Sequence, residues 1–441
     1  MDVKLMWDKF TSISLIKRIL IGIIVGAVLG VGVPHLTWIT ILGDLFVNSL
    51  KAIAPLLVFL LILSSMAKHE KGSKTHMRSI VVLYLTATLV AAVVAVGASY
   101  LFPVEIFLPK VSETTTAAPK GIATVLKGVL NNAIENPVKA LVEGQYLSIL
   151  VWASLIGVGL RAAGKQTKQV VNDLSNAVTS VVQFIIQLAP FGIVGLVFTS
   201  VSESGLNGLA KYGQLVLLVV GSMMFVSLIV YPAMVALMTH QNPYPLTLFT
   251  LRESGIPAFF TRSSAVNIPI NMELCRRLGL SKKTYAISIP LGASANSGGA
   301  AMTISIMTLA TTHTLGMEVS FPLAFLLCLL SAISATGASG IAGGSLLLIP
   351  MACSLFGISN DIAMQVVGVG FIIGVIQDSV ETAVNSASDL LFTATAEFAD
   401  LRRAGTPVNI SERVRQAKAN DSATQEDEEL DAQAVENEAG E

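Results

Sequence analysis

Charged residues are scarce in this chain. Asp, Glu, Lys and Arg make up 13% of its 441 residues, whereas about a quarter of the residues in a soluble globular domain are charged. Aromatic residues reach only 6%, while 53% of the residues are hydrophobic and the mean hydropathy is +0.71. This composition excludes an ordinary soluble domain and indicates an integral membrane protein embedded in the lipid bilayer.

Cysteine and histidine are scarce as well. The three cysteines, Cys275, Cys328 and Cys353, are odd in number and lack metal-ligand spacing, so we expect neither a disulfide framework nor a thiolate metal site. The five histidines lie far apart and form no ligand cluster. The sequence also has no phosphate-binding loop and no folded basic face, so nucleotide and nucleic-acid binding are not expected.

Long hydrophobic runs, in contrast, are abundant. In the first run, Gly22, Gly26 and Gly30 follow one another at intervals of four, which predicts close helix packing in a membrane. The first six predicted spans cover about residues 15–33, 44–67, 79–102, 123–163, 170–201 and 209–239.

Lys and Arg in the connecting segments predict the orientation of the chain. The N-terminus and the loops 68–78 and 161–168 are basic, as are the stretches 276–283 and 402–403, so the positive-inside rule places all of them in the cytoplasm. These positions agree only if two further apolar segments enter and leave the membrane on one side. The predicted re-entrant hairpins are hairpin 1, about 243–275, which opens to the cytoplasm, and hairpin 2, about 320–356, which opens to the outside.

Each hairpin precedes a helix with a polar interruption, in opposite orientations, which is the inverted-repeat order of a secondary transporter. We therefore predict an all-α integral membrane protein with eight transmembrane helices and two opposed re-entrant helical hairpins. The first predicted division is a six-helix region over 1–240, which is mainly scaffold, although its helices 3 and 6 join the transport core. The second is the transport core over 241–400, which contains helix 7, about 283–313, and helix 8, about 361–398. The third is a disordered acidic cytoplasmic tail over 401–441.

Four polar side chains follow one side of the eighth predicted helix. Asp378, Glu381, Asn385 and Asp389 are spaced by three, four and four residues, which aligns them on a helix. Carboxylates at membrane depth are costly, so they usually face a wet cavity and bind ions or substrate. Structural ion pairs for Asp378 and Asp389 remain the alternative, as does simple neutralisation of Arg262 by Glu381.

Motifs in both hairpins and in helices 7 and 8 carry a family resemblance, which covers about residues 12–400. The chain resembles the dicarboxylate/amino acid:cation symporters (glutamate-transporter-like), and among them most the bacterial serine/threonine:sodium symporters. The motifs are Thr261-Arg262-Ser263-Ser264 with Pro269, Pro290-Leu291-Gly292-Ala293 with Asn296, Gly340-Ile341-Ala342-Gly343, and Asp378, Asn385 and Asp389.

The resemblance implies a homotrimer whose transport core moves past a fixed scaffold in an elevator-like manner. It also implies that Asp378 receives the substrate ammonium group, that Asn385 donates to the substrate carboxylate and that Asp389 binds sodium. Other residues implied to bind substrate are Ser263, Ser264, Thr382, Gly340 and Ala342, and other residues implied to bind sodium are Gly292, Asn296, Asn385, Ser294 and Ser339.

Departures from the family pattern predict the substrate. Glu381 stands where the acidic-substrate members carry an Arg that binds the side-chain carboxylate. Two carboxylates at close range repel, whereas Glu381 can accept a hydrogen bond from a hydroxyl group, which favours serine and threonine over alanine. The family's acidic residue after Asn296 is Gly298 here, which predicts fewer coupled cations than in the acidic-substrate members.

The resulting hypothesis is sodium-coupled uptake of L-serine and L-threonine by a multi-pass protein of a bacterial plasma (inner) membrane, with both termini in the cytoplasm. Na⁺ is the transported coupling ion, Arg262 balances charge, no organic cofactor is expected and the chain is not an enzyme. The alternatives are sodium- or proton-coupled carriage of other small neutral amino acids or of dicarboxylates and, more distantly, an intramembrane aspartyl protease or a channel. For Asn296 and Asn385 themselves, the alternative role is hydrogen bonding between helices.

Overall fold

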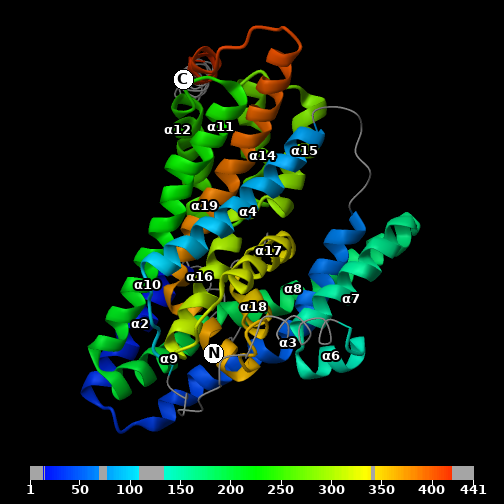
Figure 1. Cartoon of the computed structure of the whole chain (residues 1–441). Helices are drawn as coiled ribbons and strands as arrows, with labels where there is room; N and C mark the ends of the chain where they lie inside the picture. Colours follow the sequence, from blue (N-terminus) through cyan, green and yellow to red (C-terminus); the bar gives the residue numbers. More distant parts are fainter. Residues whose placement is uncertain (1–12, 14, 69–76, 109–133, 339–342, 420–441) are drawn as a thin grey trace, which may run out of the picture. The chain divides into compact units, whose positions relative to one another are not determined.

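The computed structural model describes residues 13, 15–68, 77–108, 134–338 and 343–419 (Figure 1). Within these residues all regular elements are helices and no strand occurs, which confirms the predicted all-α class. The chain forms two compact units. Unit 1 comprises Met1–Lys71, Ala87–Met224 and Ser297–Glu381, and unit 2 comprises Gly72–Thr86, Phe225–Asn296 and Thr382–Glu441.

Unit 1 contains most of the helices. Two long helices, α4 and α19, contribute one end to each unit. The helical elements of unit 1 are α2 (Leu15–Gly32), η1 (Thr37–Ile39), α3 (Thr40–Lys68), the greater part of α4 (Met77–Leu101), α6 (Pro137–Glu143), α7 (Tyr146–Gly159), η2 (Leu160–Ala162), α8 (Lys165–Gln187), α9 (Ala189–Ser204), α10 (Leu206–Phe225), α16 (Gly298–Thr314), α17 (Phe321–Ala338), η5 (Leu346–Leu348), α18 (Ile349–Ser354) and the first half of α19 (Asn360–Arg403).

Glycine lets α2 pack closely against α9 within unit 1. A Cβ atom at Gly22 would lie 2.6 Å from the carbonyl oxygen of Pro190, and one at Gly26 would lie 2.7 Å from that of Val194. A larger residue at either position would collide with the backbone of α9, so the small residues permit the close approach of the two helices. This contact confirms the packing role predicted from the glycine spacing.

Unit 2 is built from shorter helices around the second half of α19. The π-helical segments η3 and η4 each interrupt a longer helical run. The elements of unit 2 are η3 (Val226–Val230), α11 (Tyr231–Thr239), α12 (Tyr244–Thr250), η4 (Leu251–Gly255), α13 (Ile256–Thr261), α14 (Ile268–Arg277), α15 (Lys282–Ala295) and a last helix over 410–419.

A break between helices lies where the first hairpin was predicted to turn. The run α12–η4–α13 ends at Thr261, Arg262 takes a left-handed backbone conformation with φ of 53°, and α14 begins at Ile268. The predicted second hairpin has its first arm in α17 and its second arm in η5 and α18, and its tip, residues 339–342, lies outside the described residues. Of the predicted tail over 401–441, residues 420–441 also lie outside the described residues, whereas residues 401–403 end α19 and residues 410–419 form a helix.

The predicted interruption of the seventh helix is confirmed. Helix α15 ends at Ala295 and α16 begins at Gly298, because Asn296 and Ser297 take non-helical backbone conformations. Helix α19, in contrast, continues without a break from Asn360 to Arg403, so its polar stripe lies on regular helix.

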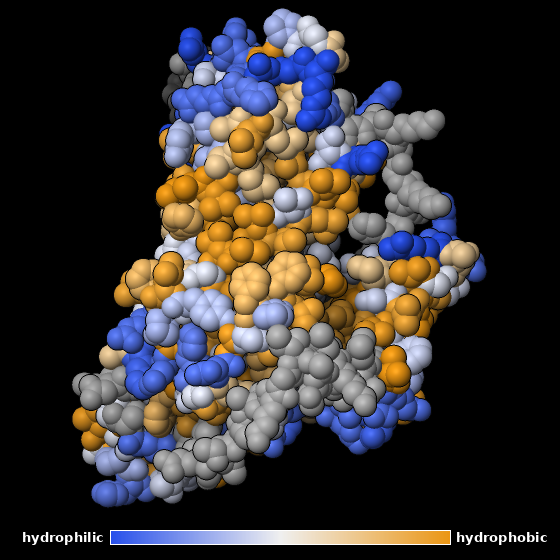
Figure 2. All heavy atoms as spheres, viewed as in Figure 1, coloured by the Kyte–Doolittle hydropathy of each residue, from blue (hydrophilic) through white to orange (hydrophobic). Residues whose placement is uncertain are grey.

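Several helices are suited to a membrane. Four of the described helices are long and apolar enough to cross one, namely Thr37–Ala67, Met77–Leu101, Leu209–Thr239 and Asn360–Arg403, and α8 with α9, bent by 53°, makes a fifth if the pair counts as one span. Figure 2 shows extensive hydrophobic surface, coloured orange. Exposed apolar side chains include Ile24 and Val28 of α2. These features support a membrane-embedded protein, and the predicted total of eight spans stays a prediction.

Candidate functional site

Asp389 lies in unit 2 within a buried cluster of neutral hydrogen-bonding groups. The Nδ2 atom of Asn296 donates to Asp389 Oδ1 at 2.9 Å and to Ser388 Oγ at 2.7 Å. Asn296 can reach both because α15 has ended one residue earlier. Asp389 is 1% exposed, and in the part of the chain that the structure describes no Lys or Arg forms an ion pair with it.

Tyr84 supports this cluster from the beginning of α4. Its hydroxyl group donates toward the carbonyl oxygens of Asp389 at 3.1 Å and Ser288 at 3.2 Å, and lies 2.9 Å from Thr393 Oγ1. Thr393 in turn donates to Ser288 Oγ at 3.0 Å. These bonds join α4, α15 and α19, so they fix the position of the backbone that carries the Asp389 carboxylate.

The cluster fits a bound cation. Gly292 allows the carboxylate to approach α15 closely, since a Cβ atom there would lie 2.7 Å from Asp389 Oδ1. The Oδ1 atom of Asn296 is buried and has no hydrogen-bond partner among the described residues. Sodium is a hard cation that prefers oxygen ligands, so a carboxylate beside an unpaired amide oxygen is a suitable donor set.

A second buried cluster in unit 2 joins the first predicted hairpin to α19. The Nδ2 atom of Asn267 donates to the Oγ atoms of Ser386 at 2.6 Å and Ser254 at 3.0 Å. The Nδ2 atom of Asn271 donates to the carbonyl oxygen of Ser386 at 3.0 Å and to its Oγ at 3.1 Å. Ser386 follows the predicted site residue Asn385, so these bonds attach η4 and the beginning of α14 to the part of α19 that contains Asn385.

Glu381 lies in unit 1, where three neutral donors converge on one carboxylate oxygen. Its Oε2 atom accepts hydrogen bonds from Gln377 Nε2 at 2.5 Å, Thr303 Oγ1 at 2.7 Å and Ser345 Oγ at 2.8 Å. Gln377 Nε2 also donates to Thr303 Oγ1 at 2.8 Å. The donors come from α16, α19 and the segment that precedes η5, so the Glu381 carboxylate is held in one orientation.

Asp378 contacts the second predicted hairpin within unit 1. The backbone N–H of Gly343 donates to Asp378 Oδ1 at 3.1 Å. Gly343 has a φ of 71°, which glycine adopts without the steric cost that a side chain would bring. The contact places one carboxylate of the stripe directly beside Gly343, which follows the predicted tip in the sequence.

Comparison with known proteins identifies the family. A model of the sodium:dicarboxylate symporter family matches residues 15–397. The chain belongs to the sodium:dicarboxylate symporter family. This assignment confirms the predicted resemblance and the prediction that the protein is a transporter rather than an enzyme.

Curated members of the family are similar to the chain over most of its length. A protein named serine/threonine transporter SstT from Lacticaseibacillus paracasei is 63% identical over 412 residues, which cover 93% of this chain and 95% of the relative. A protein of the same name from Enterococcus faecalis is 60% identical, over 90% of this chain and 95% of the relative. Another from Streptococcus agalactiae is 56% identical, over 87% of this chain and 96% of the relative.

Within this symporter, the structure joins some of the predicted site residues. Asn296, Gly292 and Asp389 come together in unit 2, as described above. Ser264 is buried and Ser294 is exposed, while Ser263 Oγ accepts from the backbone N–H of Val266 at 3.3 Å. The carbonyl oxygen of Asn385 accepts from Ser388 Oγ at 2.9 Å. Ser339, Gly340 and Ala342 lie outside the described residues, and the roles of Arg262 and Thr382 stay predictions.

Several residues of these clusters were not predicted from the sequence. They are Tyr84, Ser388, Thr393, Thr303, Ser345 and Gln377. One signal was available for Gln377, because it precedes Glu381 by four residues and therefore shares its helix face. No such signal was available for Tyr84.

Proposed function

We propose that this symporter couples the uptake of serine and threonine to sodium. One observation carries the proposal. Asp389 and Glu381 are buried carboxylates of one long helix, and both receive hydrogen bonds from neutral groups. Neither forms an ion pair with a Lys or Arg among the described residues. Intramembrane carboxylates without a basic partner usually bind transported ions or substrates. The names of the similar proteins support serine and threonine as the substrates.

The substrate site is assigned by charge and hydrogen-bonding chemistry. Asp378 receives the substrate's ammonium group, and Asn385 with Thr382 and the hairpin tips receives its carboxylate. Glu381 accepts a hydrogen bond from the substrate's hydroxyl group. Alanine or glycine would leave this buried acceptor without that bond, so the site disfavours them. The substrate-binding residues at the tips are Ser263, Ser264, Gly340 and Ala342, and Arg262 balances charge.

Sodium is assigned to the Asp389 cluster. The Asp389 carboxylate and the unpaired Asn296 Oδ1 atom supply two oxygen ligands. Backbone carbonyl groups near Gly292 and Asn385 complete this site, and those around Ser294 and Ser339 form another. Transport by this arrangement requires the sodium and substrate sites to face each side of the membrane in turn.

The architecture that serves this function has eight membrane spans and two opposed re-entrant hairpins. The protein is a homotrimer in a bacterial plasma membrane, with both termini in the cytoplasm, and the region 241–400 moves against a scaffold in an elevator-like manner. The interrupted helix at Asn296 supports this proposal, since unwound backbone at membrane depth is typical of transporter binding sites.

Uptake by purified protein in liposomes tests the function. Radiolabelled L-serine should accumulate above its external concentration only when an inward sodium gradient is imposed. Unlabelled threonine should compete, and aspartate and glutamate should not. Accumulation driven equally by a proton gradient without sodium, or efficient competition by dicarboxylates, would overturn the proposal. Flux that never exceeds equilibrium would indicate a channel.

A further inference from the structure

A short turn of unit 1, from Gly343 to Leu346, supplies two contacts of the proposed substrate site. The backbone N–H of Gly343 donates to Asp378 Oδ1 at 3.1 Å, and Ser345 Oγ donates to Glu381 Oε2 at 2.8 Å. The backbone N–H of Leu346 closes the turn by donating to the carbonyl oxygen of Gly343 at 3.1 Å. The turn therefore gives one hydrogen bond to each carboxylate, and the contacts that fix the turn also fix both bonds.

The turn interlocks with α19 through two glycines and two side chains. A Cβ atom at Gly343 would lie 3.0 Å from Cε1 of Phe371 in α19. In return, a Cβ atom at Gly370 of α19 would lie 2.7 Å from Leu346 Cδ2, 3.2 Å from its Cδ1 and 3.3 Å from its Cγ. Each of the two segments thus provides a glycine that leaves room for a side chain of the other, which permits their close approach.

Gly370 lies on the face of α19 that carries the carboxylates. Gly370, Gly374 and Asp378 follow one another at intervals of four, and Glu381 comes three residues later, so all four positions align on a helix. Helix α19 is continuous through them. The contact with Leu346 and the two hydrogen bonds from its turn therefore lie along one side of the helix.

The Leu346 side chain has little room to move away from Gly370. It is fully buried, with 0% of its surface exposed, and protein interiors are closely packed. Rotation about its Cβ–Cγ bond moves the two methyl groups but not Cγ, which is itself one of the close atoms. A methyl group added at position 370 would therefore displace the turn and not only the end of a side chain.

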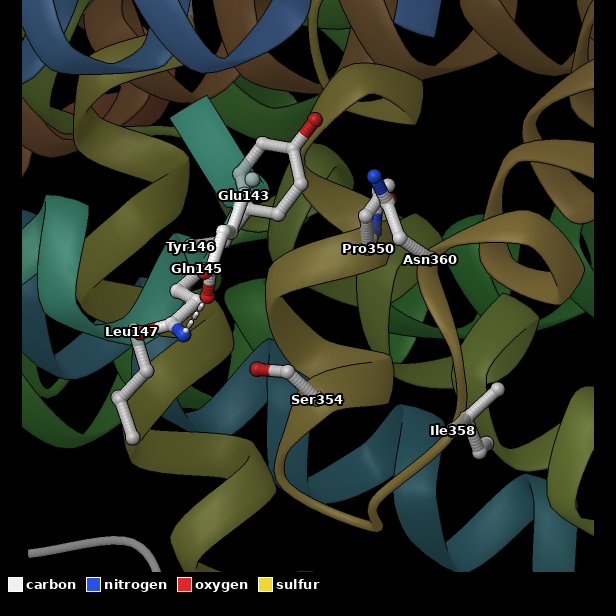
Figure 3. Close-up of a pocket in the computed structure, with 9 residues that line it drawn as sticks. Glu143, Gln145, Tyr146, Leu147, Pro350, Ser354, Ile358 and Asn360 are labelled. Carbon is white, nitrogen blue, oxygen red and sulfur yellow. Dashed lines mark hydrogen bonds between the residues drawn. The ribbon is translucent and has the colours of Figure 1, made fainter. Parts of the chain in front are cut away.

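The helix that follows the turn is less closely held. Pro350 and Ser354 of α18 line a cavity of about 230 Å³ together with Tyr146 and Asn360 (Figure 3). Since no side chain of the described residues fills this space, α18 is not packed on that side. The contact between Leu346 and Gly370 is accordingly the tighter constraint on the position of the turn.

We infer that Gly370 and Leu346 are positioning residues for the substrate site. Gly370 leaves the space that Leu346 fills, and this contact holds the turn where it can donate to both carboxylates. The inference rests on the proposed function, because the pair acts through carboxylates that are assigned to the substrate there. One methyl group added at position 370 should weaken serine binding without itself touching the substrate.

Gly370→Ala tests the inference, and Gly374→Ala is its matched control. Both add one methyl group to the same face of α19, but a Cβ atom at Gly374 would lie 3.9 Å from Leu346 Cδ1, which is an ordinary contact. In sodium-driven uptake by the full-length protein in liposomes, Gly370→Ala should raise the KM for serine by about tenfold, with little change in the maximal rate. Gly374→Ala should leave the KM within about twofold of the wild-type value.

Sodium dependence distinguishes positioning from general damage. The half-saturating sodium concentration, measured at saturating serine, should stay the same in Gly370→Ala, because the Asp389 cluster contains neither Gly370 nor Leu346. A fall in the maximal rate and a loss of sodium affinity together, at an unchanged KM for serine, would indicate a general defect and refute the inference.

A compensating substitution gives the sharper test. Leu346→Val removes one methylene group opposite Gly370, so Gly370→Ala combined with Leu346→Val conserves the volume of the contact, and such exchanges are tolerated best. Leu346→Val alone should raise the KM for serine by about threefold, whereas the double variant should have a lower KM than Gly370→Ala. Independent defects would instead multiply the two increases.

The outcomes separate this inference from the proposed function. An unchanged KM in Gly370→Ala, an equal rise in Gly374→Ala, or a double variant worse than either single variant would overturn the inference while wild-type protein still accumulates serine. Wild-type protein that does not accumulate serine would refute the proposed function, and the inference with it. If Gly370→Ala does not fold, Leu346→Val alone decides, since an unchanged KM would refute the positioning role and a raised KM would support it.

Discussion

The two carboxylate clusters of α19 differ in how completely the protein satisfies them. In unit 1, Glu381 Oε2 receives three hydrogen bonds from neighbouring side chains. In unit 2, Asp389 Oδ1 receives one side-chain hydrogen bond, from Asn296, and the Oδ1 atom of that same Asn296 has no partner among the described residues. The residues around Glu381 supply hydrogen-bond donors to its carboxylate, whereas the residues around Asp389 include an acceptor without a described donor, the Oδ1 atom of Asn296.

The difference in hydrogen bonding suits the two clusters to different ligands. A carboxylate oriented by three neutral donors is preorganised to accept one more hydrogen bond in a fixed direction, which provides specificity. A carboxylate beside an unpaired amide oxygen is an incomplete oxygen cage, which suits a cation. We therefore expect substitutions around Glu381 to change the choice of amino acid and substitutions around Asp389 to change the dependence on sodium.

The largest effect is expected from Asp389→Asn. The substitution removes the charge but keeps the size of the side chain, and losing one member of a buried charge pair costs about 3–5 kcal/mol. Sodium-driven serine accumulation in liposomes should fall by about a hundredfold or more. The control is Asp361→Asn at the exposed beginning of α19, whose carboxylate contacts Lys51. Sodium-driven accumulation that survives Asp389→Asn would remove the distinction between the clusters.

Glu381→Gln should alter selectivity more than it alters sodium dependence. A hydrogen bond to a charged group contributes about 1.5–3 kcal/mol, so the ratio of serine to alanine uptake should fall by roughly tenfold or more. Competition between the labelled amino acids measures this ratio, and the sodium concentration for half-maximal uptake should stay the same. The more drastic Glu381→Arg should lose serine uptake altogether. A preserved serine preference in Glu381→Gln would show that another residue recognises the hydroxyl group.

Thr303→Val tests whether the neutral donors orient Glu381. It removes one of the three hydrogen bonds to Oε2, at a cost of about 1 kcal/mol, so the KM for serine should rise by about fivefold while the maximal rate changes little. Thr312→Val on the same helix is the matched control, because the Thr312 hydroxyl donates to the carbonyl oxygen of Leu309 in its own helix. An equal rise in the KM for alanine would indicate a general packing defect rather than a role in hydroxyl recognition.

The sequence predicted those parts of the site whose signal is local. The run of Gly, Ser and Asn after Pro290 predicted the helix interruption, because such residues favour non-helical backbone, and α15 ends within it. Likewise the spacing of Asp378, Glu381 and Asp389 required only the period of a helix, and α19 has it. The family assignment confirms the transporter class.

The unpredicted residues depend on contacts between distant segments. Thr303 and Ser345 reach Glu381 across 78 and 36 residues, and Tyr84 reaches Asp389 across 305. A buried Thr, Ser or Tyr in an apolar helix carries no pattern that distinguishes a partner of the site from an ordinary core residue. The packing of the helices selects these residues, and a single sequence does not specify that packing.

The smallest effect is expected from Tyr84→Phe. The Tyr84 hydroxyl contacts the backbone of Asp389 and the side chain of Thr393 rather than the Asp389 carboxylate. Its loss should therefore loosen the Asp389 cluster without removing a ligand, and the half-saturating sodium concentration should rise by about two- to fivefold, the equivalent of roughly one hydrogen bond. Serine uptake measured against sodium concentration gives this value.

Tyr231→Phe separates this effect from the loss of a buried tyrosine in general. The Tyr231 ring packs against Phe392 of α19 with ring centroids 5.0 Å apart, and its hydroxyl has no partner among the described residues, so its removal should leave sodium dependence unchanged. Tyr84→Phe should also leave the serine to alanine ratio unchanged, unlike Thr303→Val. If Tyr84→Phe changed that ratio as much as the sodium dependence, the two carboxylate clusters would act as a single site and the division of roles along α19 would be wrong.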